Sequence, residues 1–95
     1  MTIDDLRTEV LDILKEKDVT GRELIKNLIS GRKDEIKSLG FEKYDVDNPA
    51  SMGNFIAIEI MPHLDEPVYK EKINVRGNKR TLYSLNPSDS RVEVK

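Results

Sequence analysis

The spacing of the apolar residues changes once along the chain, and this change limits what the chain can fold into. Up to about residue 61, most apolar residues lie three or four positions apart, which is the period of an α-helix. Between residues 69 and 85 they alternate with polar residues, which is the period of a β-strand. A chain of 95 residues has room for one core. We therefore predict one small α+β domain that is helical first and closes with a β-hairpin.

Two helices are predicted near the N-terminus from their start signals. The stretches "TIDD" and "TGRE" each place an acidic residue three positions after a threonine, at Thr2 and at Thr20. This spacing is typical of a capping box, in which the two residues satisfy each other's backbone amides. We expect one helix over residues 3–17 and a second over about 20–29, with Val19 in a short strand between them.

The stretch "SGRKDEIKSLGF" leaves two interpretations open. It fits either a bend within the second helix or a separate short helix, with Ser30 as its cap. Gly40 is the expected stop, because glycine tolerates the left-handed conformation in which many helices end.

The residues that follow fit either a helix or a strand. The stretch "FIAIEI" within residues 54–61 is rich in β-branched side chains, which favours a strand. However, Asn48 followed by Pro49 is a typical helix entry, and Pro62 would end that helix. We favour a helix over about 49–61.

A β-hairpin is predicted next. Apolar side chains share one face of each strand: Tyr69, Ile73 and Val75 on the first, and Tyr83 and Leu85 on the second. Gly77 and Asn78 are expected at the turn, since both residue types tolerate positive φ. The polar segment 86–95 is interrupted by proline, so we expect a loose tail.

The charges are unevenly distributed although the net charge is only −2. Residues 1–19 and 48–66 each carry a net charge of −3, and the second of these stretches has no Lys or Arg. Residues 67–87 carry five basic residues and one acid, a net charge of +4. Because local fields steer charged partners, an anionic partner would approach the hairpin. The alternative interpretation is a solvated edge hairpin whose lysines oppose aggregation.

Several function classes find no support in the sequence. The absence of cysteine excludes disulfides and thiolate metal sites. His63 is the only histidine, and no phosphate-binding glycine loop or catalytic constellation is visible. No apolar run approaches the roughly 18 residues of a membrane span. We expect a cytoplasmic protein that is not an enzyme and binds no metal or cofactor.

The order helix, short strand, helix, helix and basic hairpin resembles the winged helix-turn-helix family of DNA-binding domains. The resemblance covers about residues 3–86 and rests on "TGRELIKNLI", "NPASMGNFIAIEIM" and "YKEKINVRGNKRTLYSL". It implies a small winged helix over 1–86, with three helices and a C-terminal hairpin as the wing, followed by a polar tail over 87–95.

The resemblance also implies which residues contact DNA. The third helix would lie in the major groove, and the wing would contact phosphates. Carried over by position, the DNA-binding residues are Ser51 and Asn54 at base edges, Lys70, Lys72, Arg76, Asn78, Lys79 and Arg80 on the wing, and Arg22 and Lys26 on the second helix. Because the helix 49–61 lacks Lys and Arg, a second possibility is a recognition helix over 31–39. Residues 41–61 would then form an extra hairpin.

The expected partner is double-stranded DNA, bound by a small transcriptional or replication regulator. A homodimer formed through the first helix or residues 86–95 would double the contact area. The alternative function is a protein-interaction module of a replication or transcription assembly. Its acidic first helix and uncharged third helix would be the docking surfaces.

Overall fold

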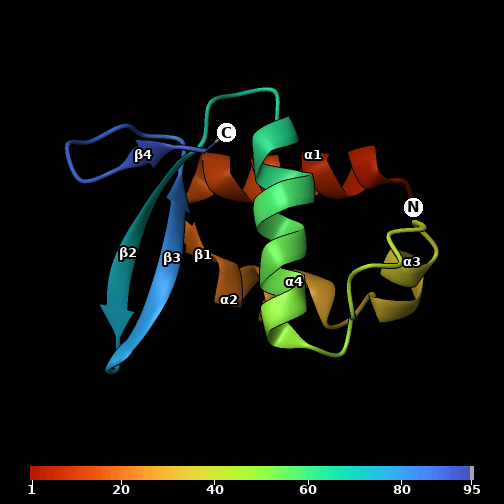
Figure 1. Cartoon of the computed structure of the whole chain (residues 1–95). Coiled ribbons are helices and arrows are strands. Elements are labelled where there is room, and N and C mark those ends of the chain that lie inside the picture. Colours follow the sequence, from red (N-terminus) through yellow and green to blue (C-terminus); the bar gives the residue numbers. More distant parts are fainter. Residues whose placement is uncertain (95) are drawn as a thin grey trace.

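The computed structural model describes residues 1–94 and shows a small α+β fold of four helices and a four-stranded antiparallel sheet (Figure 1). The helices are α1 Ile3–Glu16, α2 Gly21–Leu24, α3 Lys33–Lys37 and α4 Pro49–Phe55. A π-helical turn, η1 Ile25–Ile29, continues α2. Another, η2 Ile56–Ile60, and a 3-10 turn, η3 Met61–His63, continue α4.

Both predicted capping boxes are formed. The Asp5 amide donates to the Thr2 hydroxyl over 3.2 Å, and the Thr2 amide donates to the Asp5 carboxylate over 2.9 Å. Thr20 and Glu23 make the same exchange over 3.1 and 3.2 Å. These bonds satisfy amides that have no partner within their own helices. The predicted starts of the first two helices are therefore confirmed.

The segment after α2 forms a separate short helix. The Ser30 hydroxyl donates to the Lys26 carbonyl over 2.6 Å, so Ser30 belongs to the end of η1. The prediction that Ser30 caps the next helix is wrong, because α3 begins after Arg32, which makes no side-chain cap. Gly40 has the left-handed φ of +87° expected at a helix stop.

The segment 49–61 is helical. The Asn48 side-chain oxygen accepts hydrogen bonds from the amides of Ala50 and Ser51, over 2.9 and 3.3 Å. Pro49 occupies the first helical position, where its missing amide hydrogen costs nothing. This entry signal and the buried stripe that follows it outweigh the strand preference of the β-branched residues. The extra hairpin over 41–61 is therefore wrong.

Four antiparallel strands form the sheet, in the order β1-β3-β2-β4. They are β1 Val19–Thr20, β2 Tyr69–Val75, β3 Asn78–Ser84 and β4 Val92–Glu93. The short strand expected at Val19 is confirmed, because Val19 lies opposite Tyr83 on β3. The predicted hairpin is confirmed as β2 and β3.

The hairpin turn lies one residue earlier than predicted. Val75 and Asn78 are opposite each other, so Arg76 and Gly77 are the two turn residues. Their φ angles are +52° and +80°, as two-residue hairpin turns with two positive φ values require. Asn78 was expected in the turn and instead begins β3. Arg76 takes the position for which asparagine, aspartate or glycine is usual.

The C-terminal segment is ordered against the sheet, which corrects the prediction of a loose tail. Strand β4 pairs with the start of β2, and the Val94 amide donates to the Val68 carbonyl over 2.8 Å. The Val94 side chain is buried. Arg91 holds this segment through ion pairs to Asp18 at 3.1 Å and to Glu71 at 3.5 Å.

The core lies between the helices and the base of the sheet. Leu6, Phe55 and Ile60 are fully buried, and the Phe55 ring packs edge-on against Phe41 and Tyr44 at centroid distances of 5.6 and 5.4 Å. Away from this core, every side chain of residues 71–82 is at least partly exposed. The β2–β3 hairpin therefore projects from the domain beside α4 (Figure 1).

Candidate nucleic-acid interface

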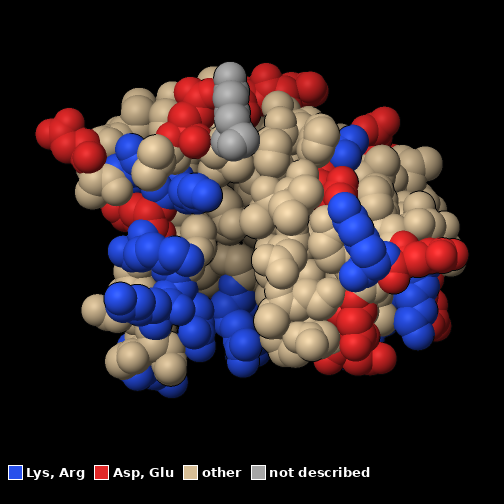
Figure 2. Space-filling model, viewed as in Figure 1, with Lys and Arg blue, Asp and Glu red and all other residues tan. Residues whose placement is uncertain are grey.

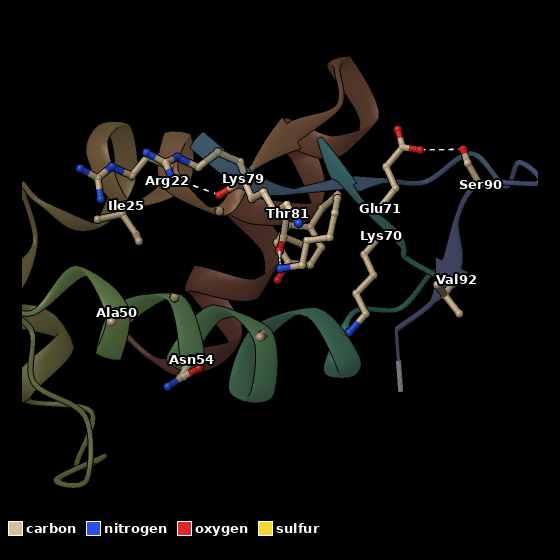
Figure 3. A pocket seen from close by; sticks show the side chains of 16 residues that line it. Arg22, Ile25, Ala50, Asn54, Lys70, Glu71, Lys79, Thr81, Ser90 and Val92 are labelled. Atoms are coloured by element: carbon tan, nitrogen blue, oxygen red, sulfur yellow. Dashed lines mark hydrogen bonds between the residues drawn. The ribbon is translucent and has the colours of Figure 1, made fainter. Parts of the chain in front are cut away.

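A cleft of about 500 Å³ lies between the projecting hairpin and the helices α2 and α4 (Figure 3). Six of the ten residues that the sequence predicts to contact DNA line this cleft: Arg22, Asn54, Lys70, Lys72, Lys79 and Arg80. They come from α2, from α4 and from the two strands of the hairpin, three parts of the chain that are far apart in the sequence. The fold therefore brings most of the predicted site to one place.

Cations dominate the hairpin wall of the cleft. Lys70 and Lys72 alternate along β2 and lie opposite Tyr83 and Thr81 on β3. The Lys72 ammonium donates to the Thr81 hydroxyl over 2.7 Å, which holds it over the sheet. Lys70 extends from β2 toward the α4 side of the cleft (Figure 3). Among the lining residues, five are basic and one, Glu71, is acidic.

The opposite wall is uncharged. It consists of Ala50, Gly53 and Asn54 on α4 and Ala57 on η2, which continues α4. Their spacing places them on one face of this continuous helical segment. Small side chains keep this wall close to the helix backbone. Asn54 is exposed and its amide points away from the hairpin, which leaves it at the rim (Figure 3).

Four predicted residues lie outside the cleft. The Ser51 hydroxyl is occupied near the start of α4, where it accepts a hydrogen bond from the Asp45 amide over 2.7 Å. Lys26 is exposed on η1. Arg76 and Asn78 are exposed at the hairpin tip, beyond the end of the cleft. The structure therefore separates a tip group from the cleft group.

The surface charge follows the same division. Lys and Arg side chains gather over the hairpin and the lower margin of the cleft, whereas α4 presents an uncharged surface beside them (Figure 2). Most acidic side chains in this view lie at the top of the molecule and on the side opposite the hairpin. The positive charge of residues 67–87 is thus concentrated in space as well as in sequence.

Tyr83 lines the cleft but is not among the contact residues predicted from the sequence. Its side chain is only 4% exposed, yet it lines the cleft beneath Lys70. Gly21 lies against the ring, since a Cβ added there would sit 3.6 Å from Cε2. Burial raises the pKa of the Tyr83 hydroxyl, so it stays protonated as a hydrogen-bond donor. The turn predicted at Gly77 and Asn78 would place Leu85 opposite Lys70, so no sequence signal pointed to Tyr83.

Residues 1–94 contain no cluster of metal ligands and no membrane-spanning helix. No three His, Asp or Glu side chains of this part of the chain cluster as metal ligands would. No helix in the same range is long and apolar enough to cross a membrane. His63 lies at the end of η3, in a shallow hollow with Asp4, Arg7 and Asp65. The absence of enzymatic activity stays a prediction.

Comparisons of the chain with protein-family models, with curated proteins and with solved structures find no match. Any assignment of function therefore depends on the geometry and charge of the chain itself.

Proposed function

We propose that this chain is a DNA-binding protein of the winged helix-turn-helix type, with the β2–β3 hairpin as its wing and α4 as its reading helix. The observation that carries the proposal is the cleft in which Arg22, Lys70, Lys72, Lys79 and Arg80 converge. Phosphate contacts by Lys and Arg release counterions and supply most of the affinity of such proteins. In this proposal the chain is a small transcriptional or replication regulator.

The order of the elements supports the winged-helix part of the proposal. The order α1, β1, α2, α4 and the β2–β3 hairpin matches the order that the resemblance implies. The chain differs from it in having a fourth helix, α3, and a further strand, β4, after the hairpin. Strand β1 pairs with β3, which joins the helical part to the hairpin. In this arrangement α4 and the hairpin face the same partner.

The backbone at the hairpin tip gives a second, independent support. Arg76 is the one residue other than glycine within 1–94 that has a positive φ. This conformation costs an arginine roughly 1 kcal/mol or more, and such costs gather at functional sites. An arginine retained at a position that favours glycine or asparagine is consistent with phosphate binding.

A salt titration tests the proposal. Anisotropy with a blunt duplex of about two helical turns should show binding that weakens steeply between about 50 and 200 mM salt. Replacing Arg76, Lys79 and Arg80 with alanine should lower the slope of log K against log salt by up to about three. Thermal stability should change little, because exposed charges contribute at most about 1 kcal/mol each.

The matched control removes the same charge elsewhere. Lys15, Lys37 and Lys43 are exposed and lie outside the cleft. Their replacement by alanine should leave the slope close to that of the parent. Equal effects of the two triple variants would show that only net charge matters, and absence of duplex binding by the parent would reject the proposal.

A second function is favoured by two exposed aliphatic side chains. Ile58 on η2 is 52% exposed, and Val92 on β4 is 63% exposed. Exposed aliphatic side chains are common at protein interfaces. In this alternative the chain docks onto a replication or transcription protein. Ile58→Lys would then abolish co-purification of that partner, whereas the hairpin variant would retain it.

A further inference from the structure

The interior of the cleft is too small for a double helix. A cube of 500 Å³ would measure about 8 Å along each edge, whereas the major groove alone of B-DNA is about 12 Å wide. A duplex that lies across the hairpin and α4 would contact exposed side chains at the rim, such as Lys70, Lys72 and Lys79, together with Arg76 at the tip. It would leave the interior of the cleft, which Tyr83 lines, unfilled.

The two walls of the cleft differ in chemistry. The hairpin wall presents the ammonium groups of Lys70 and Lys72, whereas the α4 wall presents Ala50, Gly53 and Ala57 and no charge. A single nucleic-acid strand has the same two-sided character, with phosphates along one side and uncharged bases along the other. The volume also falls within the range of about 300–1,000 Å³ of sites that enclose small ligands.

Tyr83 adds a hydrogen-bond donor at the floor of the cleft. Tyr83 is only 4% exposed, and its hydroxyl makes no hydrogen bond to any other group of residues 1–94. Tyr83 lines the cleft, and its hydroxyl is not a fully buried unpaired group. A phosphate oxygen in the cleft would accept a hydrogen bond from it.

We infer that the cleft binds one unpaired DNA strand, whose phosphodiester backbone lies along the hairpin wall and accepts a hydrogen bond from Tyr83. The inference rests on the proposed function, since the same hairpin serves both. The inference specifies the DNA further: the preferred partner is a duplex that carries a single-stranded end. The rim contacts the duplex, and the cleft receives the unpaired strand.

Three DNA substrates and two variants test the inference. The substrates are a blunt duplex, the same duplex with a single-stranded extension of about six nucleotides, and the unpaired strand alone. The extension should raise the affinity of the parent about tenfold. Tyr83→Phe, which keeps the ring and removes the hydroxyl, should abolish most of this gain and change blunt-duplex affinity less than about twofold. Tyr69→Phe on the other sheet face is the matched control.

The outcomes separate this inference from the proposed function. No gain from the extension, or equal losses in the Tyr83 and Tyr69 variants, would overturn the inference and leave duplex binding standing. Binding only of substrates with an unpaired strand would uphold it and overturn duplex reading. No binding of any substrate would reject both. If Tyr83→Phe melts early, Lys70→Gln on the same wall replaces it. The ratio of extended-duplex to blunt-duplex affinity should then fall, even though Lys70 also contributes to duplex binding.

Discussion

Arg76, at the tip of the β2–β3 hairpin, has an unfavourable backbone conformation and an exposed positive charge. Its φ of +52° is the conformation in which glycine and asparagine are most stable among the common residues. The side chain is exposed and contacts nothing that would compensate for the backbone. Folding alone would therefore favour another residue here.

Arg76→Asn should stabilise the protein and weaken its binding. The free energy of unfolding should rise by roughly 1 kcal/mol, because asparagine adopts positive φ at lower cost. Duplex affinity should fall, and the salt slope should decrease by about 0.9 because one phosphate contact is lost. Urea unfolding and anisotropy measure the two effects separately.

Lys79→Asn provides the matched control for Arg76→Asn. It removes one charge from the same hairpin, three residues along the chain from Arg76, at a position without positive φ. It should weaken binding similarly and give no gain in stability. Stabilisation of both variants, or of neither, would contradict the account of Arg76.

Individual residues were predicted unevenly from the sequence. The basic cleft residues were found because a run of charges around a turn is visible without any structure. Tyr83 was not predicted as a contact residue, because alternation along one strand gives the face of a side chain and not its neighbours. Whether that face meets a helix or a cleft depends on how far the hairpin projects, and sequence periodicity carries no information on this point.

At the scale of elements, the segment 86–94 shows how side chains can order a stretch that has no periodic pattern. The Arg91 guanidinium donates to the Ser84 hydroxyl over 2.8 Å and to the Asn86 carbonyl over 2.9 Å. It also pairs with Asp18 and Glu71, and its side chain is 15% exposed. One arginine thus connects the start of β1, strand β2 and the C-terminal segment.

Arg91→Ala should release β4 and destabilise the domain. Loss of several partly buried hydrogen bonds to a charged group should lower the free energy of unfolding by roughly 2–3 kcal/mol. The Val94 amide should lose its protection from hydrogen exchange, because its bond to the Val68 carbonyl depends on the position of this segment. Asp89→Ala, at an exposed position three residues before β4, should change the unfolding free energy by less than about 0.5 kcal/mol. Unchanged exchange at Val94 in the Arg91 variant would contradict this role.

The predicted boundaries of helices were correct where a local sequence signal marks them. Capping boxes and the Asn48-Pro49 entry fix helix starts through a few neighbouring atoms, so they could be read from the sequence. Strand β4 has two residues and pairs with β2 across more than twenty positions. Its existence depends on Arg91 and on long-range contacts. The turn was displaced by one residue because Arg76 occupies a position that its residue type disfavours.

At the scale of the whole molecule, two tyrosines should make the free energy of unfolding fall at alkaline pH. Burial raises the pKa of Tyr44, and its hydrogen bond to the Glu59 carboxylate over 2.8 Å raises it further. Burial also raises the pKa of Tyr83. In the unfolded chain these phenols titrate near pH 10. Their contribution to the free energy of unfolding is therefore complete below about pH 10. It is lost as the pH rises through the pKa values that the two phenols have in the folded protein.

Urea unfolding between about pH 7 and pH 11 measures this dependence. The free energy of unfolding should fall above about pH 10, where the unfolded chain releases phenolic protons before the folded one. Tyr44→Phe should reduce the slope in that range, separately from any constant offset at pH 7 caused by the lost hydrogen bond. A slope identical to that of the parent would contradict the contribution of Tyr44.

The pairing of β4 with β2 bears on how the binding experiments can be labelled. Ser90 and Val92 line the same cleft as Lys70, so the segment that ends the described part of the chain borders it. The N-terminus lies on the opposite side of the molecule from the hairpin (Figure 1). A fluorophore or affinity tag at the C-terminal end would crowd the surface that it is meant to report on. The same group attached at Met1 would leave that surface open.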